Sequence, residues 1–384
     1  MKKKILYVTG SRAEYGIMKR LLLALRDDES IELSIVATGM HCDEKYGLTY
    51  KNIENDGLVV NKLINININN STNADVISSM SFCQKEFGIF FQDNKYDAVM
   101  LLGDRYEIFS VAVAAAMHNL PIIHLHGGEK TLGNYDEFIR HAITKMSRLH
   151  LASTEEYRKR IIQMGEHPET VINIGALGAE NALSMNLPSK TELEANFGSL
   201  TRPYFVVVFH PETLNSVSPS YQVMQLLNAL QKFSNSYDFI FIGSNSDTGS
   251  EEIMAKITCF CHDTGARIFT SIKPEDYLAL NKYSQGLIGN SSSGLIEIPS
   301  LHIPTVNIGD RQRGRVRGES VIDCLCNTDA IAEAISRSQE SDLLEKVKMT
   351  ENPYYKNDVL KAALKNIKNF MEENKTEYKD FYDL

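Results

Sequence analysis

The chain has 384 residues, of which 43% are hydrophobic and 23% are charged, and its formal net charge is -9. This length predicts two domains, because a single hydrophobic core rarely extends over so many residues. The negative charge argues against nonspecific binding of nucleic acid. No stretch approaches the ~20 apolar residues that a membrane span needs. The sequence therefore predicts a cytoplasmic protein with no nucleic-acid or membrane partner.

The first half repeats one pattern: a short β-branched run, a polar or glycine-containing turn, and a helical stretch. Alternation of this kind predicts a parallel sheet that is covered by helices on both faces. The predicted strands are residues 5–9, 32–38, 98–102, 121–126 and 171–174, and helical periodicity occurs at 15–26 and 108–118.

The pattern starts again in the second half, with predicted strands at 204–209, 239–242, 287–289 and 305–308. Glycine and proline residues near 175–188 mark the joint. We therefore predict one domain at 1–175 and a nucleotide-binding domain at 176–365. Apolar residues at helical spacing predict a C-terminal helix, 366–384, that packs back onto the first domain.

Charged residues gather directly after the predicted strands. Ligands of open parallel sheets bind beyond the carboxyl ends of the strands, so a site is expected there. Any one such residue is more often a cap or a salt-bridge partner, but together they predict a nucleotide-sugar site between two domains. Carboxylates can transfer protons, and cations can stabilise a leaving diphosphate. The set comprises Arg12, Asp104, Arg105, Glu129, Asp136, Arg140 and His210.

A glycine- and serine-rich stretch, Gly289–Gly294, follows an apolar run and precedes a helical-looking segment at 295–300. Small hydroxyls and free amides at a helix N-terminus suit a phosphate. Glu297, one turn further on, suits the diol of a ribose. The plain alternative is an ordinary serine-rich helix cap.

Three further patterns leave alternatives open. His124 and His126 form an H-x-H pair that could bind a metal, but no third ligand motif accompanies it, which favours a metal-free site. Asn245 and Asp247 could cap a helix or contact the sugar or the uracil. Arg311 begins an alternating arginine cluster that could bind an anion or form a solvated face.

Taken in order, the motifs of this chain resemble those of the UDP-N-acetylglucosamine (UDP-GlcNAc) 2-epimerases. The closest likeness is to the hydrolysing branch that begins bacterial sialic acid synthesis, and it spans nearly the whole chain. The motifs that carry it are Ser11–Gly16, Gly103–Arg105, Gly127–Glu129, Asp136 with Ile139–His141, Phe209–Pro211, Gly289–Ser292 and Gly309–Gln312.

The resemblance implies an α/β, glycosyltransferase-B-like fold: two Rossmann-like, doubly wound domains face a cleft, and a C-terminal helix returns to the first domain. It implies UDP-GlcNAc and UDP as ligands, no cofactor, and a homodimer or a dimer of dimers. Asp104 and Asp136 match catalytic acids of the family. By the same likeness Glu297 would bind the ribose, and Arg311 the sugar or phosphate side. The residues that would hold the diphosphate are Arg12, His210, Ser291 and Ser292.

Two local differences within the family are informative. A glutamate that commonly precedes Gly-Gly-Glu is His126 here, which leaves His126 or Glu129 to take its role in proton transfer. Non-hydrolysing epimerases look like His-Arg-Arg-Glu after the second-domain strand, whereas this chain has His-Pro-Glu-Thr at 210–213. The second difference favours the hydrolysing branch.

The implied reaction converts UDP-GlcNAc and water into N-acetylmannosamine and UDP, by elimination to 2-acetamidoglucal and then hydration. The alternatives are the same reaction on a UDP-2,4-diacetamido-trideoxyhexose, as in legionaminic acid synthesis, a glycosyltransferase of the same fold, and a noncatalytic sensor. The candidate catalytic residues are Asp104, His126, Glu129, Asp136 and His210. The candidate substrate-binding residues are Arg12, Arg105, Arg140, Asn245, Asp247, Ser291, Ser292, Glu297 and Arg311.

Overall fold

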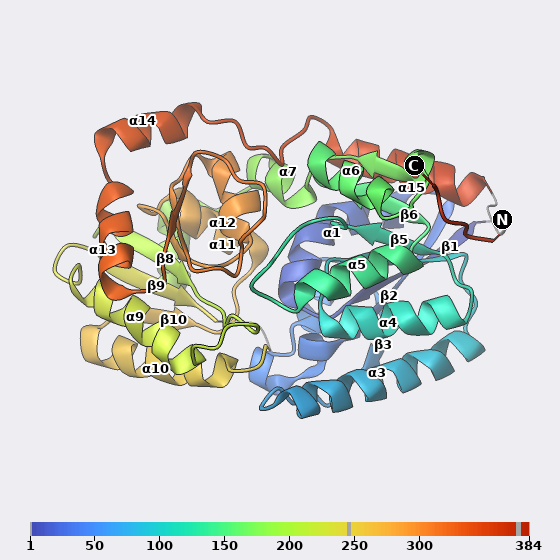
Figure 1. Ribbon diagram of the computed structural model, residues 1–384, viewed down its shortest axis with the longest axis horizontal. Coiled ribbons are helices and arrows are strands. Elements are labelled where there is room, and N and C mark those ends of the chain that lie inside the picture. Colours follow the sequence, from blue (N-terminus) through green and yellow to red (C-terminus); the bar gives the residue numbers. More distant parts are fainter. Residues whose placement is uncertain (1, 244–246, 374–377, 384) are drawn as a thin grey trace. The chain divides into compact units, whose positions relative to one another are not determined.

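The computed structural model describes residues 2–243, 247–373 and 378–383. The chain forms two compact α/β units (Figure 1). The first unit contains Met1–Glu129, Asp136–Leu177 and Lys356–Leu384, and the second contains Lys130–Tyr135 and Gly178–Tyr355. The change of unit at Leu177 lies close to the predicted joint. The excursion of Lys130–Tyr135, here called the crossing segment, has no counterpart in the sequence-based prediction.

The first unit is built on a seven-stranded parallel sheet in the order β3-β2-β1-β4-β5-β6-β7. Its strands are β1 (Lys3–Thr9), β2 (Ile31–Thr38), β3 (Val60–Ile64), β4 (Ala98–Leu102), β5 (Ile122–Leu125), β6 (Leu149–Ala152) and β7 (Val171–Asn173). Its helices are α1 (Arg12–Asp27), α2 (Tyr50–Asn55), α3 (Asn73–Asp93), α4 (Tyr106–Met117), α5 (Asp136–Met146), α6 (Glu155–Gln163) and α15 (Val359–Glu372).

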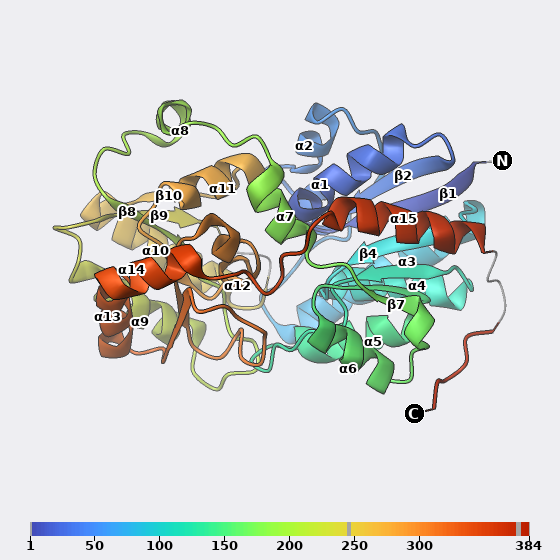
Figure 2. The same ribbon diagram turned by 90° about the horizontal axis from the view of Figure 1, so that it is seen from above.

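Helices cover both faces of this sheet, with α1 and α15 on one face and α4 and α5 on the other (Figure 2). Helix α1 begins where Ser11 accepts a hydrogen bond from the backbone N–H of Glu14, at 3.4 Å. Its buried side chains recur at helical spacing and pack on β1 and β2. The apolar strands and these helix faces form the core of the first unit.

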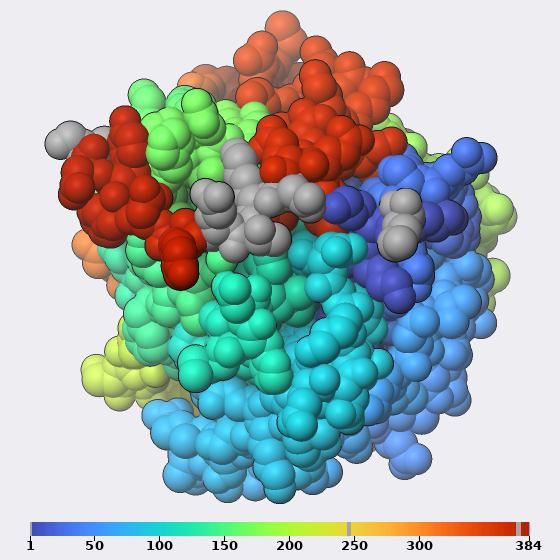
Figure 3. Space-filling view, turned by 90° about the vertical axis from the view of Figure 1, so that its right-hand side faces the viewer, coloured from blue at the N-terminus to red at the C-terminus, as the bar shows by residue number. Residues whose placement is uncertain are grey.

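The C-terminal helix differs from its predicted bounds. Helix α15 begins at Val359 and ends at Glu372, and residues 378–383 are not helical. It buries Val359, Ala363, Ile367 and Met371 in the core of the first unit, because these side chains share one face of the helix. Beyond it, the Lys379 ammonium donates to the carbonyls of Lys145 and Ser147 at the end of α5. Figure 3 shows this tail on the surface beside the green segments of the first unit.

The second unit is built on a six-stranded parallel sheet in the order β10-β9-β8-β11-β12-β13. Its strands are β8 (Tyr204–Val208), β9 (Asp238–Ile242), β10 (Arg267–Phe269), β11 (Leu287–Gly289), β12 (Thr305–Ile308) and β13 (Val321–Cys324). Its helices are α7 (Leu177–Ser184), which begins at the boundary, α8 (Lys190–Phe197), α9 (Pro219–Gln231), α10 (Ser250–Thr264), α11 (Pro274–Lys282), α12 (Ser293–Ile296), α13 (Thr328–Arg337) and α14 (Ser341–Met349).

Both sheets reverse their strand order once, between β1 and β4 in the first unit and between β8 and β11 in the second. At such a point the loops that follow the two central strands diverge and leave room for a ligand. Directly after β1, β4, β8 and β11 lie six residues that the sequence singles out: Arg12, Asp104, Arg105, His210, Ser291 and Ser292. None of the described helices has the length and hydropathy that crossing a bilayer requires.

Candidate functional site

Arg140 and the partly buried Asp104 form an ion pair at the carboxyl edge of the first sheet. Arg140 is fully buried, and its Nε donates to Asp104 Oδ2 at 2.8 Å, while its Nη2 donates to the same oxygen. Its Nη1 donates to the backbone oxygen of Glu129 at 2.8 Å and to Glu137 Oε2 at 3.1 Å. Arg140 therefore fixes the Asp104 carboxylate and the backbone of Glu129 together. The predicted contact of Arg140 with the substrate remains a prediction.

His126 and Glu129 form a buried pair in the loop after β5. His126 Nδ1 lies 3.0 Å from Glu129 Oε1, which also accepts from the Ser153 hydroxyl at 2.9 Å. His126 has a left-handed backbone, with φ of 63°, which few non-glycine residues adopt. Its Nε2 is buried without a hydrogen-bond partner among the described residues. Such an unpaired buried group is costly and points to a functional role.

This geometry suits a general base. When Glu129 accepts the Nδ1–H of a neutral imidazole, Nε2 carries the lone pair that can take up a proton. The sequence left His126 and Glu129 as alternatives for one role, and the structure joins them in one hydrogen-bonded pair.

His124 has a structural environment. It is fully buried, its Nε2 lies 2.8 Å from the Gly103 oxygen, and its Nδ1 lies 3.3 Å from the Thr144 hydroxyl. Burial lowers the pKa of His124 to about 3, so the ring is neutral. Both ring nitrogens face protein groups, which gives the H-x-H pair no support as a metal site. Among the described residues, no group of three or more His, Cys, Asp and Glu side chains is placed to hold a metal ion.

Arg105 lies between two buried carboxyl groups, of which Glu107 had not been singled out from the sequence. Its Nε donates to Glu107 Oε1 at 2.5 Å and lies 3.8 Å from Glu14 Oε1. Glu14 Oε2 accepts from the backbone N–H of Gly10 at 2.7 Å. The pKa of Glu14 is raised to about 8, mainly by burial and to a smaller extent by the negative charge of Glu107. Glu14 therefore retains its proton at neutral pH.

Glu14 gives a prediction for stability. Because its pKa is higher in the folded chain than in the unfolded chain, the folded state retains this proton longer, and its contribution to stability is lost as pH rises from about 4.5 to about 8. Glu14→Gln has no such ionisation and is expected to flatten this decline. Thermal unfolding of both proteins across that range measures it. If the stability of the wild type and of Glu14→Gln declined equally with rising pH, the prediction would be contradicted.

Arg12 and Asp136 occupy helix starts in the first unit. Arg12 is the first residue of α1 and Asp136 the first residue of α5, and both are partly buried. At a helix N-terminus the backbone N–H groups favour negative charge, which suits the Asp136 carboxylate.

His210 and Asn290 join the loops after β8 and β11 in the second unit. The Asn290 side chain accepts from the backbone N–H of His210 at 2.7 Å and donates to its carbonyl at 2.8 Å. Gly289, with φ of 141°, brings these loops close, because a Cβ there would lie 1.8 Å from the Val208 oxygen. Asn290 is fully buried, so it is a structural link that the motif alone did not reveal.

The serine-rich stretch begins a shorter helix than the sequence predicted. Helix α12 spans only Ser293–Ile296 and is followed by a 3-10 turn at Ile298–Leu301. Ser291 and Ser292 are partly buried, and Ser291 Oγ lies 3.0 Å from Ser293 Oγ. Such a short helix provides a weak dipole, so anion binding there would rest on the loop amides and hydroxyls.

Glu297 ends helix α12 and is partly buried. It packs closely on Gly178, where an added Cβ would lie 2.8 Å from Glu297 Oε1. Its position is therefore fixed by packing as well as by the helix.

Arg311 is held beside Asn290. Its Nη1 donates to the Asn290 carbonyl at 3.2 Å, and the Gln312 amide donates to the same oxygen at 2.9 Å. Glu212 Oε1 accepts the backbone N–H groups of Asp310 at 2.7 Å and Arg311 at 3.2 Å. Glu212 and Gln312 are thus supporting residues that the sequence did not identify as part of a site.

Asp247 lies 3.8 Å from Arg311 Nη2, and both side chains are buried. Arg313 is exposed, so the arginine cluster does not act as one group. Asn245 lies outside the described residues.

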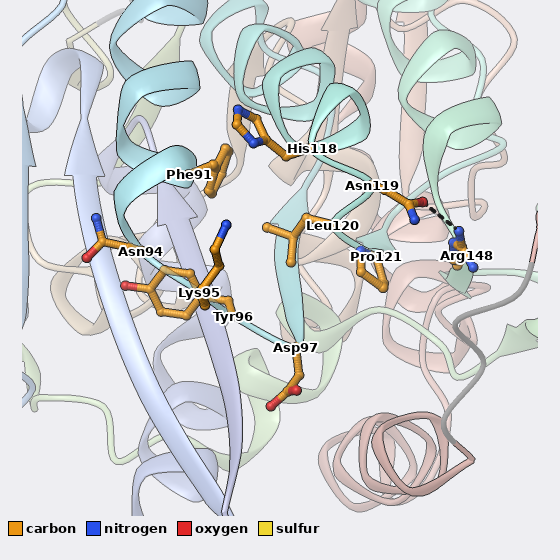
Figure 4. Close-up of a pocket in the computed structure, with 10 residues that line it drawn as sticks. All are labelled: Phe91, Asn94, Lys95, Tyr96, Asp97, His118, Asn119, Leu120, Pro121 and Arg148. Atoms are coloured by element: carbon orange, nitrogen blue, oxygen red, sulfur yellow. Dashed lines mark hydrogen bonds between the residues drawn. The ribbon is translucent and has the colours of Figure 1, made fainter.

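A separate surface pocket of about 240 Å³ lies at the opposite edge of the first sheet (Figure 4). Asp97 and Pro121, which directly precede β4 and β5, line it together with Lys95, His118 and Arg148. None of the candidate site residues lines this pocket.

Several known proteins are similar to this chain in sequence or in fold. A family model described as UDP-N-acetylglucosamine 2-epimerase matches residues 23–368. Polysialic acid biosynthesis protein P7 of Escherichia coli is 59% identical over 382 residues, covering 100% of this chain and 98% of that protein. A Campylobacter jejuni GDP/UDP-N,N'-diacetylbacillosamine 2-epimerase (hydrolyzing) is 36% identical over 371 residues, covering 95% and 96%.

The crystal structure of UDP-GlcNAc 2-epimerase from Neisseria meningitidis bound to UDP-GlcNAc is similar in fold, with a TM-score of 0.79. It is 18% identical, and the match covers 95% of this chain and 100% of that chain. The expected glycosyltransferase-B-like fold of two parallel-sheet α/β domains is confirmed by this likeness.

Proposed function

Because the chain belongs to the UDP-N-acetylglucosamine 2-epimerase family, we propose that it is a hydrolysing enzyme of this family. Its reaction would convert UDP-GlcNAc and water into N-acetylmannosamine and UDP. The observation that carries the chemistry is the buried His126–Glu129 pair. In this pair His126 Nε2, which has no hydrogen-bond partner among the described residues, would accept the proton. The His-Pro-Glu-Thr sequence at 210–213 supports the hydrolysing branch, as does the similarity to a Campylobacter relative that is named a hydrolysing epimerase.

The second unit would hold the nucleotide. Loop amides and hydroxyls at Ser291 and Ser292, together with His210, would bind the diphosphate, and Glu297 would accept hydrogen bonds from the ribose. Arg311, held by the Asn290 carbonyl, would face the sugar or phosphate side. Arg12 of the first unit would add positive charge. Stabilising the negative charge of UDP favours breaking of the C1–O bond.

The first unit would move the protons. One acid–base group removes the hydrogen at C2 as UDP leaves, which gives 2-acetamidoglucal. A second group then returns a proton to C2 from the opposite face as water adds at C1. Asp104, Asp136 and the His126–Glu129 pair supply these groups. Arg140, whose bonds hold Asp104, would act as a positioning residue.

Product analysis tests the proposal. UDP and N-acetylmannosamine are expected in equal amounts from UDP-GlcNAc without an added cofactor. In deuterated water the product is expected to carry deuterium at C2, because the original hydrogen is lost to the enzyme base and the solvent. Mass spectrometry and NMR of the product measure both. Retained protium would exclude elimination, and UDP-N-acetylmannosamine as the end product would indicate the non-hydrolysing reaction.

A second candidate is the same reaction on a UDP-2,4-diacetamido-trideoxyhexose. The name of the Campylobacter relative favours it, whereas the higher identity to the polysialic acid biosynthesis protein favours UDP-GlcNAc and a role in sialic acid synthesis. The ratio of kcat/KM for the two sugars decides between them.

A further inference from the structure

The crossing segment, Lys130–Tyr135, connects two candidate catalytic residues directly. Glu129 precedes it and Asp136 follows it, and both belong to the first unit, whereas the segment itself belongs to the second. Helix α5 begins immediately after the segment, at Asp136. The segment is therefore joined covalently, at both ends, to residues proposed to move protons.

The crossing segment is bound to the loop that follows β8. Asn134 is almost fully buried, and its Oδ1 accepts from the backbone N–H of Thr213 at 3.0 Å and from the Thr213 hydroxyl at 2.8 Å. The same hydroxyl oxygen accepts from the Tyr135 N–H at 3.2 Å, and the Leu214 N–H donates to the Gly133 carbonyl at 3.3 Å. Thr213 lies in the same loop as His210.

The crossing segment is also bound to the loop that follows β12. The Leu132 N–H donates to the Arg313 carbonyl at 3.1 Å. Gly133 approaches so closely that an added Cβ would lie 2.6 Å from the Asp310 oxygen. This second loop carries Arg311.

Glu212 binds the two loops to each other. Its carboxylate accepts the N–H groups of Asp310 and Arg311, and its own neighbour Thr213 binds Asn134. The two loops and the crossing segment thus form one hydrogen-bonded block. A ligand that orders either loop would also restrict the segment, because ordering propagates through contiguous contacts.

We propose that the crossing segment couples nucleotide binding by the second unit to the positions of Glu129 and Asp136, with Asn134 as the positioning residue. This inference rests on the proposed function. Proton transfer is sensitive to placement, since a displacement of ~1 Å can lower a rate by about 100-fold. Glu129 also holds His126, so its placement affects both members of that pair.

Asn134→Ala tests the coupling, because it removes the oxygen that binds Thr213. We expect kcat for UDP-GlcNAc to fall by about 10- to 100-fold, while the UDP dissociation constant measured by calorimetry changes less than about threefold. Asn134→Asp retains an oxygen that can accept both hydrogen bonds from Thr213 and is expected to recover most of kcat. Thr213→Val removes the hydroxyl from the other side and is expected to act like Asn134→Ala.

The second unit offers a matched control. Gln225 Oε1 accepts from the Thr328 N–H at 3.0 Å and from the Thr328 hydroxyl at 2.8 Å, the same pattern outside the crossing segment. Gln225→Ala and Thr328→Val are expected to retain kcat, although they lower the thermal unfolding temperature about as much as Asn134→Ala and Thr213→Val do. Equal losses of kcat in the control variants would overturn the inference, because general destabilisation would then explain the effect.

Hydrogen exchange provides a readout that needs no turnover. UDP is expected to slow amide exchange in 129–136 of the wild-type protein and to slow it much less in Asn134→Ala. If the wild type is active, and Asn134→Ala has a normal kcat and the same UDP-induced slowing of exchange as the wild type, the coupling is overturned but the proposed function is not. A wild-type protein that releases no UDP from UDP-GlcNAc would overturn the proposed function and the inference with it.

Discussion

Asp104→Asn and Asp136→Asn are each expected to lower turnover of UDP-GlcNAc by roughly two to four orders of magnitude. Asparagine keeps the size of the side chain but cannot accept the transferred proton. In Asp104→Asn one oxygen remains to accept from Arg140, so the pair retains much of its geometry. UDP affinity is expected to change far less, because neither residue is assigned to the diphosphate.

The control for these variants is Asp56→Asn. Asp56 is a partly buried carboxylate of the first unit that accepts from Tyr15 and Lys19, each at 2.7 Å. It lies in no candidate loop, so its variant is expected to turn over normally. Single-turnover kinetics measures the rate of the chemical step, and calorimetry measures UDP affinity, so the two effects can be separated. Near-normal turnover in both Asp104→Asn and Asp136→Asn would contradict the acid–base assignment and leave the nucleotide site intact.

His126→Ala is expected to reduce turnover to a similar extent, by roughly two to four orders of magnitude. It removes His126 Nε2, which has no hydrogen-bond partner in the part of the chain that the structure describes. Glu129→Gln is expected to be milder, because its amide oxygen can still accept from His126 Nδ1 and from the Ser153 hydroxyl. Steady-state kinetics of both variants gives the ranking.

His118→Ala is the matched control for the loss of an imidazole. His118 is exposed and lines the pocket at the opposite edge of the sheet. We expect it to retain normal turnover. If Glu129→Gln were more damaging than His126→Ala, the proton-transfer role would move to Glu129.

Most inner strands of both sheets could be predicted because they are short runs of mostly apolar residues. The predictions for β4, β11 and β12 are confirmed residue for residue. Strand β3 was missed because most of its side chains are exposed at a sheet edge, and β10 and β13 are edge strands too. Strand β6 was missed although it is buried, because nothing in the local sequence shows that His150 lies 2.9 Å from buried Glu166.

The loops that carry the candidate site could also be predicted, since they follow strands directly. Their internal contacts could not, because they join residues far apart in the sequence. Arg105 and Arg140 looked equally suited to an anionic ligand, and the sequence did not show that each also binds a carboxylate of the protein, Glu107 and Asp104 respectively. Asn290 and Glu212 carry no motif that reveals their backbone partners. Burial and hydrogen bonding, rather than residue type, separate the supporting residues from the others.

The return of α15 to the first unit has a consequence for synthesis on the ribosome. The first sheet leaves the exit tunnel early, but Val359, Ala363, Ile367 and Met371 complete its core only when almost all of the chain has been translated. The second unit is contiguous except for the crossing segment, and all of it precedes α15. We therefore expect the later-made unit to be able to finish folding first, while the nascent first unit keeps an apolar groove that a chaperone could cover.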